Sequence, residues 1–252
     1  MTEKIKVLFL AANPVNVAYR PHLDQEAHEI SERIQIGTKR DQFDFITQWA
    51  MRPEDLQKAL LRFKPHIVHF SGHGSKTQGI ILQDYAGNMV PVSKNALVGL
   101  FKVLKDNIRV VLLNACYSKA QAEGISQTID YTIGMKKAVG DEAAIAFSSA
   151  FYQGLAFGRT VKESFELAKN QIQIAGIRES KTPVLTVRDG VNPLEPFLPH
   201  TQQSDPGLIP PQDSRPAAGG PVQNINTTGG PLINQGPIIN QVNGDAVFNN
   251  NK

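Results

Sequence analysis

Short apolar runs alternate with helix-like segments along most of the chain. The runs have the length and composition of buried strands, and they occupy residues 5–10, 43–50, 66–70, 109–113, 131–135 and 183–187. The segments between them predict helices, which cover residues 21–36, 53–64 and 93–104 and stretches that begin at residues 119, 141 and 160. Strands that alternate with helices in this way predict an α/β sandwich with a mostly parallel sheet.

Local signals mark some of these boundaries. Pro53 is followed by two acidic residues, and proline suits the first turn of a helix while acids suit its positive N-terminal end. Ser93 is suited to cap the helix that follows it. Residues 79–84 and 89–92 predict a small hairpin around a turn that contains Gly87 and Asn88.

The composition changes sharply near Pro199, which predicts a boundary between a folded domain and a tail. Residues 1–198 carry the alternating pattern and are expected to fold as one domain. Residues 199–218 are rich in proline and polar residues and have the composition of a disordered linker. Residues 219–252 are rich in Gly, Asn and Gln and contain a repeat, described below.

Charge and cysteine content exclude several classes of function. The formal net charge is only +3 and the basic residues are spread along the chain, so we expect neither a nucleic-acid partner nor an anionic membrane surface. No apolar run is long enough to span a bilayer, and the N-terminus does not have the pattern of a signal peptide. A single cysteine excludes an internal disulfide and suits a reducing cytoplasm.

Cofactor and metal motifs are missing from the sequence. No glycine-rich phosphate-binding motif opens a helix, which argues against a nucleotide-binding α/β domain. No cluster of Cys and His residues has zinc-ligand spacing. We therefore expect no cofactor and no metal.

A histidine and the cysteine follow two of the predicted strands. His73 lies in a Ser-Gly-His-Gly segment after the strand 66–70, and Cys116 closes Asn-Ala-Cys after the strand 109–113. In parallel α/β sheets the chemistry sits at the carboxyl ends of strands, and a thiol needs a nearby base to become a useful nucleophile. We expect the backbone N–H groups of Gly74 and Cys116 to form an oxyanion hole. His69 lies inside its strand and is expected to be structural.

These segments also resemble a known family. Residues 67–74 and 110–118 look like the two central motifs of the CHAT domain, a bacterial relative of caspases and separases, and residues 7–14, 52–56 and 140–144 resemble small bacterial CHAT proteins. The resemblance covers about residues 4–187. It implies a caspase-like αβα sandwich, a dyad of His73 and Cys116, and hydrolysis of a peptide bond in a protein substrate.

One position departs from the relatives. Two residues before the nucleophile, caspases carry glutamine and several relatives carry aspartate, whereas this chain has Asn114. A neutral amide provides no charge to select a charged substrate side chain. We take Asn114 and Asp141 as candidate substrate-pocket residues. Either Asp141 or Asp130 would supply the missing charge, and the sequence alone places neither acid in the pocket.

The tail carries an internal repeat. Residues 230–235 read Gly-Pro-Leu-Ile-Asn-Gln and residues 236–241 read Gly-Pro-Ile-Ile-Asn-Gln. Aliphatic residues interleaved with Asn and Gln suit cross-β stacking, and the segment resembles bacterial amyloid signalling motifs, through which a receptor with a matching terminal motif templates assembly. Because prolines oppose stacking, the core is expected at residues 238–250. A plain disordered tail and a short hexapeptide solenoid remain alternatives.

Together with the family resemblance, the sequence predicts a cytoplasmic, caspase-like cysteine endopeptidase. We expect an effector in a bacterial signalling, defence or cell-death system, activated through its tail by a receptor or by homo-assembly. The alternative is a non-catalytic adaptor, in which the caspase-like domain binds a partner and the tail assembles.

Overall fold

The computed structural model describes residues 4–15, 17 and 19–197. The predictions made for the linker and for the repeat at residues 199–252 therefore lie outside the described residues. No helix within the described ranges is long and apolar enough to cross a membrane.

A mostly parallel sheet runs through the centre of the described domain. Its strand order is β2-β1-β3-β7-β8-β9, and among these described strands only β9, beside β8, pairs antiparallel with its neighbour. The bounds are β1 Ile5–Ala12, β2 Phe43–Gln48, β3 Ile67–Gly72, β7 Val110–Asn114, β8 Tyr131–Met135 and β9 Pro183–Val187. Each strand coincides with an apolar run of the sequence, so the predicted α/β sandwich with a mostly parallel sheet is confirmed.

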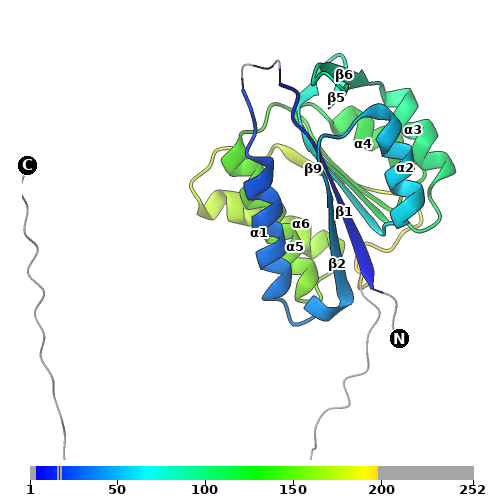
Figure 1. The fold of residues 1–252 in the computed structure, drawn as a ribbon. Helices are drawn as coiled ribbons and strands as arrows, with labels where there is room; N and C mark the ends of the chain where they lie inside the picture. Colours follow the sequence, from blue (N-terminus) through cyan, green and yellow to red (C-terminus); the bar gives the residue numbers. More distant parts are fainter. Residues whose placement is uncertain (1–3, 16, 18, 198–252) are drawn as a thin grey trace, which may run out of the picture. The chain divides into compact units, whose positions relative to one another are not determined.

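Helices cover both faces of this sheet, as Figure 1 shows. One layer contains α1, α5 and α6, and the other contains α2, α3 and α4. Their bounds are α1 Leu23–Gln35, α2 Pro53–Phe63, α3 Lys94–Val103, α4 Lys119–Ile125, α5 Asp141–Ala156 and α6 Val161–Ile174, with a short 3₁₀ helix at Arg40–Gln42. The result is a three-layer αβα arrangement.

Local chemistry sets several of the helix ends. Pro53 occupies the first turn of α2, as predicted. The Ser93 hydroxyl accepts a hydrogen bond from the Ala96 N–H at 3.3 Å, which caps α3. Thr160 and Glu163 form a reciprocal capping box at the start of α6. These caps satisfy N–H groups that the helix itself leaves without acceptors.

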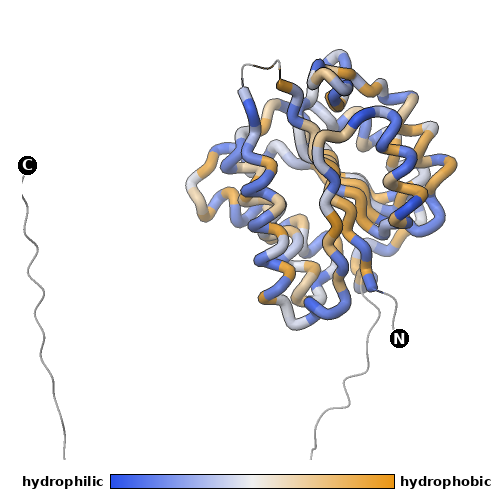
Figure 2. The backbone as a smooth tube through the Cα atoms, viewed as in Figure 1, coloured by the Kyte–Doolittle hydropathy of each residue, from blue (hydrophilic) through white to orange (hydrophobic). Residues whose placement is uncertain are grey.

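Alternation along the strands divides the core in two. Val7, Phe9 and Ala11 of β1 pack on the α1, α5 and α6 side, whereas Leu8 and Leu10 pack on the other side. Because successive strand residues point to opposite faces, a continuously apolar strand feeds both cores. Figure 2 shows the central strands as mostly hydrophobic, whereas hydrophilic and hydrophobic residues alternate along the helices.

A second, antiparallel sheet contains β4 Gly74–Ser75, β5 Gly79–Gln83 and β6 Met89–Val92. The hairpin of β5 and β6 matches the prediction from the sequence. The two-residue strand β4 was not predicted, because it is too short to leave a hydropathy pattern. It pairs Gly74 with Ile80, and so ties the segment after β3 to the hairpin.

Candidate active site

Strand register brings the two candidate residues together. Ser71 of β3 is paired with Asn114 of β7 at the carboxyl end of the sheet. His73 follows Ser71 by two residues and Cys116 follows Asn114 by two, so the chain delivers both to the same edge from adjacent strands, which lie about 4.8 Å apart. Both residues line one small pocket.

A strained turn presents the cysteine. Tyr117 has φ +59°, a left-handed conformation that is uncommon for a residue with a bulky side chain. Buried Ser118 holds this turn, because its hydroxyl donates to the Leu113 carbonyl at 2.7 Å and accepts from the Met135 N–H at 2.9 Å. The Cys116 sulfur lies 3.5 Å from the Val139 nitrogen. Backbone strain of this kind often occurs at functional sites.

Gly74 lies directly against the cysteine backbone. A Cβ atom at position 74 would lie 2.1 Å from the Cys116 carbonyl oxygen and 2.9 Å from the Cys116 nitrogen. Only glycine can occupy this position without displacing Cys116. The two backbone segments predicted to form an oxyanion hole are therefore in contact.

His73 is half-buried, and its Nε2 atom is buried without a hydrogen-bond partner among the described residues. Burial lowers the pKa of this imidazole below its ordinary value of 6.5, and the charge of nearby Asp141 opposes the shift. The shift favours the neutral ring, which is the form able to accept a proton.

The pocket around these residues has a volume of about 100 Å³. Both predicted substrate-pocket residues, Asn114 and Asp141, are among those that line it. Asp130 is not, because it lies before β8 at the opposite end of the sheet, where it binds Arg188 and Arg109. The described lining residues are Tyr19, Pro21, His22, Leu23, Glu26, Ser71, Gly72, His73, Asn114, Cys116, Val139, Asp141, Ala144 and Ile145.

Glu26 of α1 lies at the buried base of this pocket and was not identified from the sequence. Its side chain is almost fully buried and accepts hydrogen bonds from Asn114 at 2.7 Å, from Ser148 at 2.6 Å and from Ser71. His69 Nε2 lies 3.2 Å from the same carboxylate. Burial acts to raise the pKa of Glu26, but the contacts with His69, Ser148 and Ser71 outweigh it and hold the pKa below its ordinary value.

A signal for Glu26 was present in the sequence. It lies four residues before Ile30 and three after Leu23, on the apolar stripe of α1. A carboxylate on a buried helix face requires donors from the elements it packs against. His69, which was expected to be structural, is fully buried and lies beside this carboxylate.

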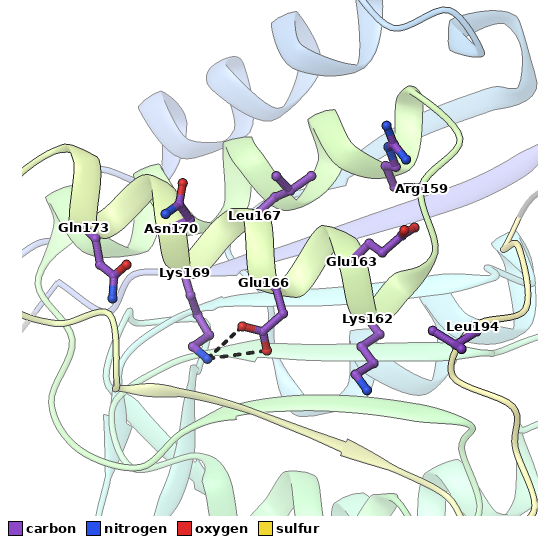
Figure 3. A pocket seen from close by; sticks show the side chains of 9 residues that line it. All are labelled: Arg159, Lys162, Glu163, Glu166, Leu167, Lys169, Asn170, Gln173 and Leu194. Carbon is purple, nitrogen blue, oxygen red and sulfur yellow. Dashed lines mark hydrogen bonds and ion pairs between the residues drawn. The ribbon is translucent and has the colours of Figure 1, made fainter.

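A larger hollow lies elsewhere, on the outer side of α6, and holds no residue of the candidate dyad. Figure 3 shows its lining side chains, with Lys169 paired to Glu166 at 3.1 Å. Its volume is about 730 Å³, and its lining residues are Arg159, Lys162, Glu163, Glu166, Leu167, Lys169, Asn170, Gln173 and Leu194. No Cys, Ser or Thr is among these described residues, so the hollow offers no thiol or hydroxyl nucleophile.

No group of three or more His, Cys, Asp or Glu side chains suited to hold a metal ion occurs in the part of the chain that the structure describes.

Comparison with known proteins identifies the class. The CHAT domain model matches residues 7–203, so the chain belongs to the CHAT domain family. A solved structure of caspase-1 from Spodoptera frugiperda has a similar fold, with a TM-score of 0.50 and 11% identity over 73% of this chain and 86% of that chain. The caspase-like fold implied by the sequence resemblance is confirmed.

Two curated relatives are proteases by name. A "Probable protease" from Gillisia limnaea is 27% identical over 151 residues, which cover 59% of this chain and 26% of the relative. A "Roc-COR-CHAT protease" from an unknown prokaryotic organism is 26% identical over 159 residues, which cover 60% of this chain and 15% of the relative. The matched part is thus about a quarter or less of each relative's length.

Proposed function

We propose that this protein is a cysteine endopeptidase in which Cys116 is the nucleophile and His73 is its general base. The observation that carries the proposal is the convergence of the two residues, from adjacent parallel strands, on one pocket at the carboxyl edge of the sheet. The names of the two curated relatives support the same reaction class.

In the first half of the reaction, His73 takes the proton of the Cys116 thiol as the sulfur attacks the scissile carbonyl carbon. The carbonyl oxygen becomes an oxyanion, which the backbone N–H groups of Gly74 and Cys116 stabilise. The C–N bond then breaks, and the His73 imidazolium returns the proton to the leaving amine. The product is a thioester on Cys116 and a free amino terminus.

Hydrolysis completes the cycle. His73 takes a proton from water, whose oxygen attacks the thioester carbonyl through a second oxyanion in the same place. The C–S bond breaks, the carboxylic product leaves, and the proton returns to the Cys116 sulfur. The half-buried setting of His73 suits this role, because a neutral ring is needed at the start of both halves.

Co-expression with the products of neighbouring genes tests the proposal. We expect new protein termini by mass spectrometry with the wild-type chain and none with Cys116→Ala. If the two produce the same termini, the domain is a binding module and the endopeptidase proposal is wrong.

We further propose that the tail at residues 219–252 recruits or assembles the protein and thereby activates it. Its support is the repeated Gly-Pro-aliphatic-Ile-Asn-Gln block in the sequence. A matching receptor motif or further copies of this chain are the partners that such a segment would pair with. High local concentration would then favour contacts between catalytic domains.

A peptide of residues 230–252 tests the tail separately. We expect fibres with a spacing of about 4.7–4.8 Å, and none after Val242→Pro, because proline removes a ladder donor. A wild-type peptide that remains soluble, alone and with seeds from a partner bearing a similar motif, would contradict assembly through the tail without affecting the dyad.

A further inference from the structure

The pocket beside the dyad is lined by hydrogen-bond acceptors and negative charge. Its ionisable lining residues are Glu26, Asp141, Tyr19, His22, His73 and Cys116. No Lys or Arg is present among the described lining residues. A ligand group that fills this pocket therefore meets two carboxylates and no strong cation.

Glu26 keeps its charge at the base of the pocket. Its Oε1 atom faces Asn114, Ser148 and His69, whereas Oε2 receives a hydrogen bond only from Ser71 among the described residues. A carboxylate oxygen accepts more than one hydrogen bond, so Oε2 retains acceptor capacity. The contacts with His69, Ser148 and Ser71 stabilise the ionised form.

Asn114 adds an acceptor that lacks a donor. Its side-chain nitrogen donates to Glu26 Oε1 at 2.7 Å and lies 3.1 Å from Ser148 Oγ and 3.4 Å from the Ala144 carbonyl oxygen. These three acceptors on one side fix which end of the amide is the nitrogen. The Oδ1 atom is buried and has no partner within the described ranges, and the whole residue is 3% exposed. Because buried acceptors are normally hydrogen-bonded, we expect a ligand to supply the missing donor.

Asp141 lies at the pocket wall, at the first residue of α5. Its Oδ2 atom accepts from the His22 backbone N–H at 3.0 Å and lies 2.8 Å from His22 Nδ1, and the Tyr19 hydroxyl also hydrogen-bonds to this side chain. These contacts fix the carboxylate beside the pocket and leave it partly exposed.

We propose that this pocket binds the side chain of a Lys or Arg residue that immediately precedes the scissile bond. The proposal rests on the proposed endopeptidase function and names its substrate class. The ammonium or guanidinium donates to Asp141 and to Asn114 Oδ1, and the Glu26 carboxylate attracts it from the base of the pocket. An acidic substrate side chain would place like charges together, and an apolar one would leave Asn114 Oδ1 without a donor.

The test uses the whole 252-residue chain and fluorogenic peptides that differ only at the residue before the cleaved bond. Citrulline has nearly the shape of arginine without its charge, and norleucine serves the same purpose for lysine. We expect kcat/KM to be about 100-fold higher for Arg than for citrulline. Asp141→Asn should lower that ratio about 10-fold, because it removes one charge and keeps one acceptor oxygen.

Glu142→Gln is the matched control. Glu142 is the exposed neighbour of Asp141 in the first turn of α5 and does not line the pocket. The Arg-to-citrulline ratio should be unchanged in this variant. An equal loss in both variants would assign the preference to general charge at the helix end and contradict recognition by Asp141.

The remaining outcomes separate the two proposals. Cys116-dependent cleavage that is equally fast after Arg and citrulline, or fastest after Asp or norleucine, would overturn the basic pocket and leave the endopeptidase standing. Absence of Cys116-dependent cleavage of every peptide would contradict both.

Discussion

Acidic residues at the two ends of the central sheet have different kinds of partner. At the amino end of β8, Asp130 binds Arg188 at 2.6 Å and Arg109 at 3.5 Å. At the carboxyl end, Glu26 and Asp141 have hydroxyl, amide and histidine partners, with no Lys or Arg ion pair among the described residues. An acid paired with arginine is neutralised by a permanent cation, whereas one held by hydroxyl, amide and imidazole groups remains able to interact with a ligand or a catalytic group.

His69 lies within β3 and His73 directly after it, and we expect their substitution to have different consequences. The loss of activity in His73→Ala is the largest effect that we predict. His73→Ala should lower kcat/KM about 10³-fold or more with the fold intact, because a nucleophile without its base loses most of its reactivity. His69→Ala should instead lower the free energy of unfolding, because it removes a fully buried partner of Glu26. Peptidase assays with circular dichroism check both. Near-wild-type cleavage by His73→Ala would contradict the assignment of the base.

Glu26→Gln tests the carboxyl end of the sheet, and Asp130→Asn is its counterpart at the amino end. Loss of the buried charge should cost about 3 kcal/mol, because its donors lose a charged acceptor and His69 loses its partner. Asp130→Asn should cost about 1 kcal/mol or less, because that ion pair is partly exposed to solvent. Urea unfolding of each variant measures both values.

The effect of Glu26 also depends on pH in a defined direction. Because its folded-state pKa lies below the ordinary value of 4.5, the carboxylate contributes its stability above about pH 4.5 and loses it as the pH falls further. The difference between wild type and Glu26→Gln should therefore shrink on acidification. Equal stability of the two proteins at pH 7 would show that the buried charge stabilises nothing.

Two glycines provide a further matched pair. Gly74→Ala should lower kcat about 10- to 100-fold, because the new Cβ would collide with the Cys116 backbone and misplace the nucleophile. Gly99 lies in α3, where an added Cβ atom would have no neighbour within 4 Å, so Gly99→Ala should leave kcat unchanged and raise stability by about 0.5–1 kcal/mol. A fully active Gly74→Ala would mean that the contact between the two segments is irrelevant to catalysis.

The smallest expected effect concerns pH and activity. Burial lowers the pKa of His73 below 6.5, so the acid limb of kcat/KM should have its midpoint below pH 6.5. The Asp141 charge favours the protonated ring, so Asp141→Asn should move the midpoint to a still lower pH. A pH–rate profile of the wild type and of Asp141→Asn measures this midpoint. A midpoint that moves upward in Asp141→Asn would contradict this placement of the charge.

Much of this domain could be predicted from the sequence, because its signals are local. Buried strands leave continuous apolar runs, and Ser93 and Thr160 start helices through contacts within one turn. His73 and Cys116 could be assigned to one edge because parallel strands all end on the same side.

What could not be predicted depends on contacts between distant segments. Only the fold decides which of Asp130 and Asp141 lines the pocket. In the sequence Asp130 precedes strand β8 and Asp141 follows it, so the sequence alone offers no choice between them. The antiparallel direction of β9 and the two-residue strand β4 leave no pattern of their own. The burial of Glu26 depends on hydrogen-bond partners in β3, β7 and α5, which are distant from it in the sequence.

The reactivity of the single cysteine tests the central claim most directly. Because the chain contains one cysteine, the mass added by iodoacetamide reports Cys116 alone. We expect alkylation at pH 6.5 to be at least about 10-fold faster than that of a free thiol and to fall to the free-thiol rate in His73→Ala, because the ring removes the thiol proton. A rate equal to that of a free thiol, unchanged by His73→Ala, would contradict a catalytic dyad.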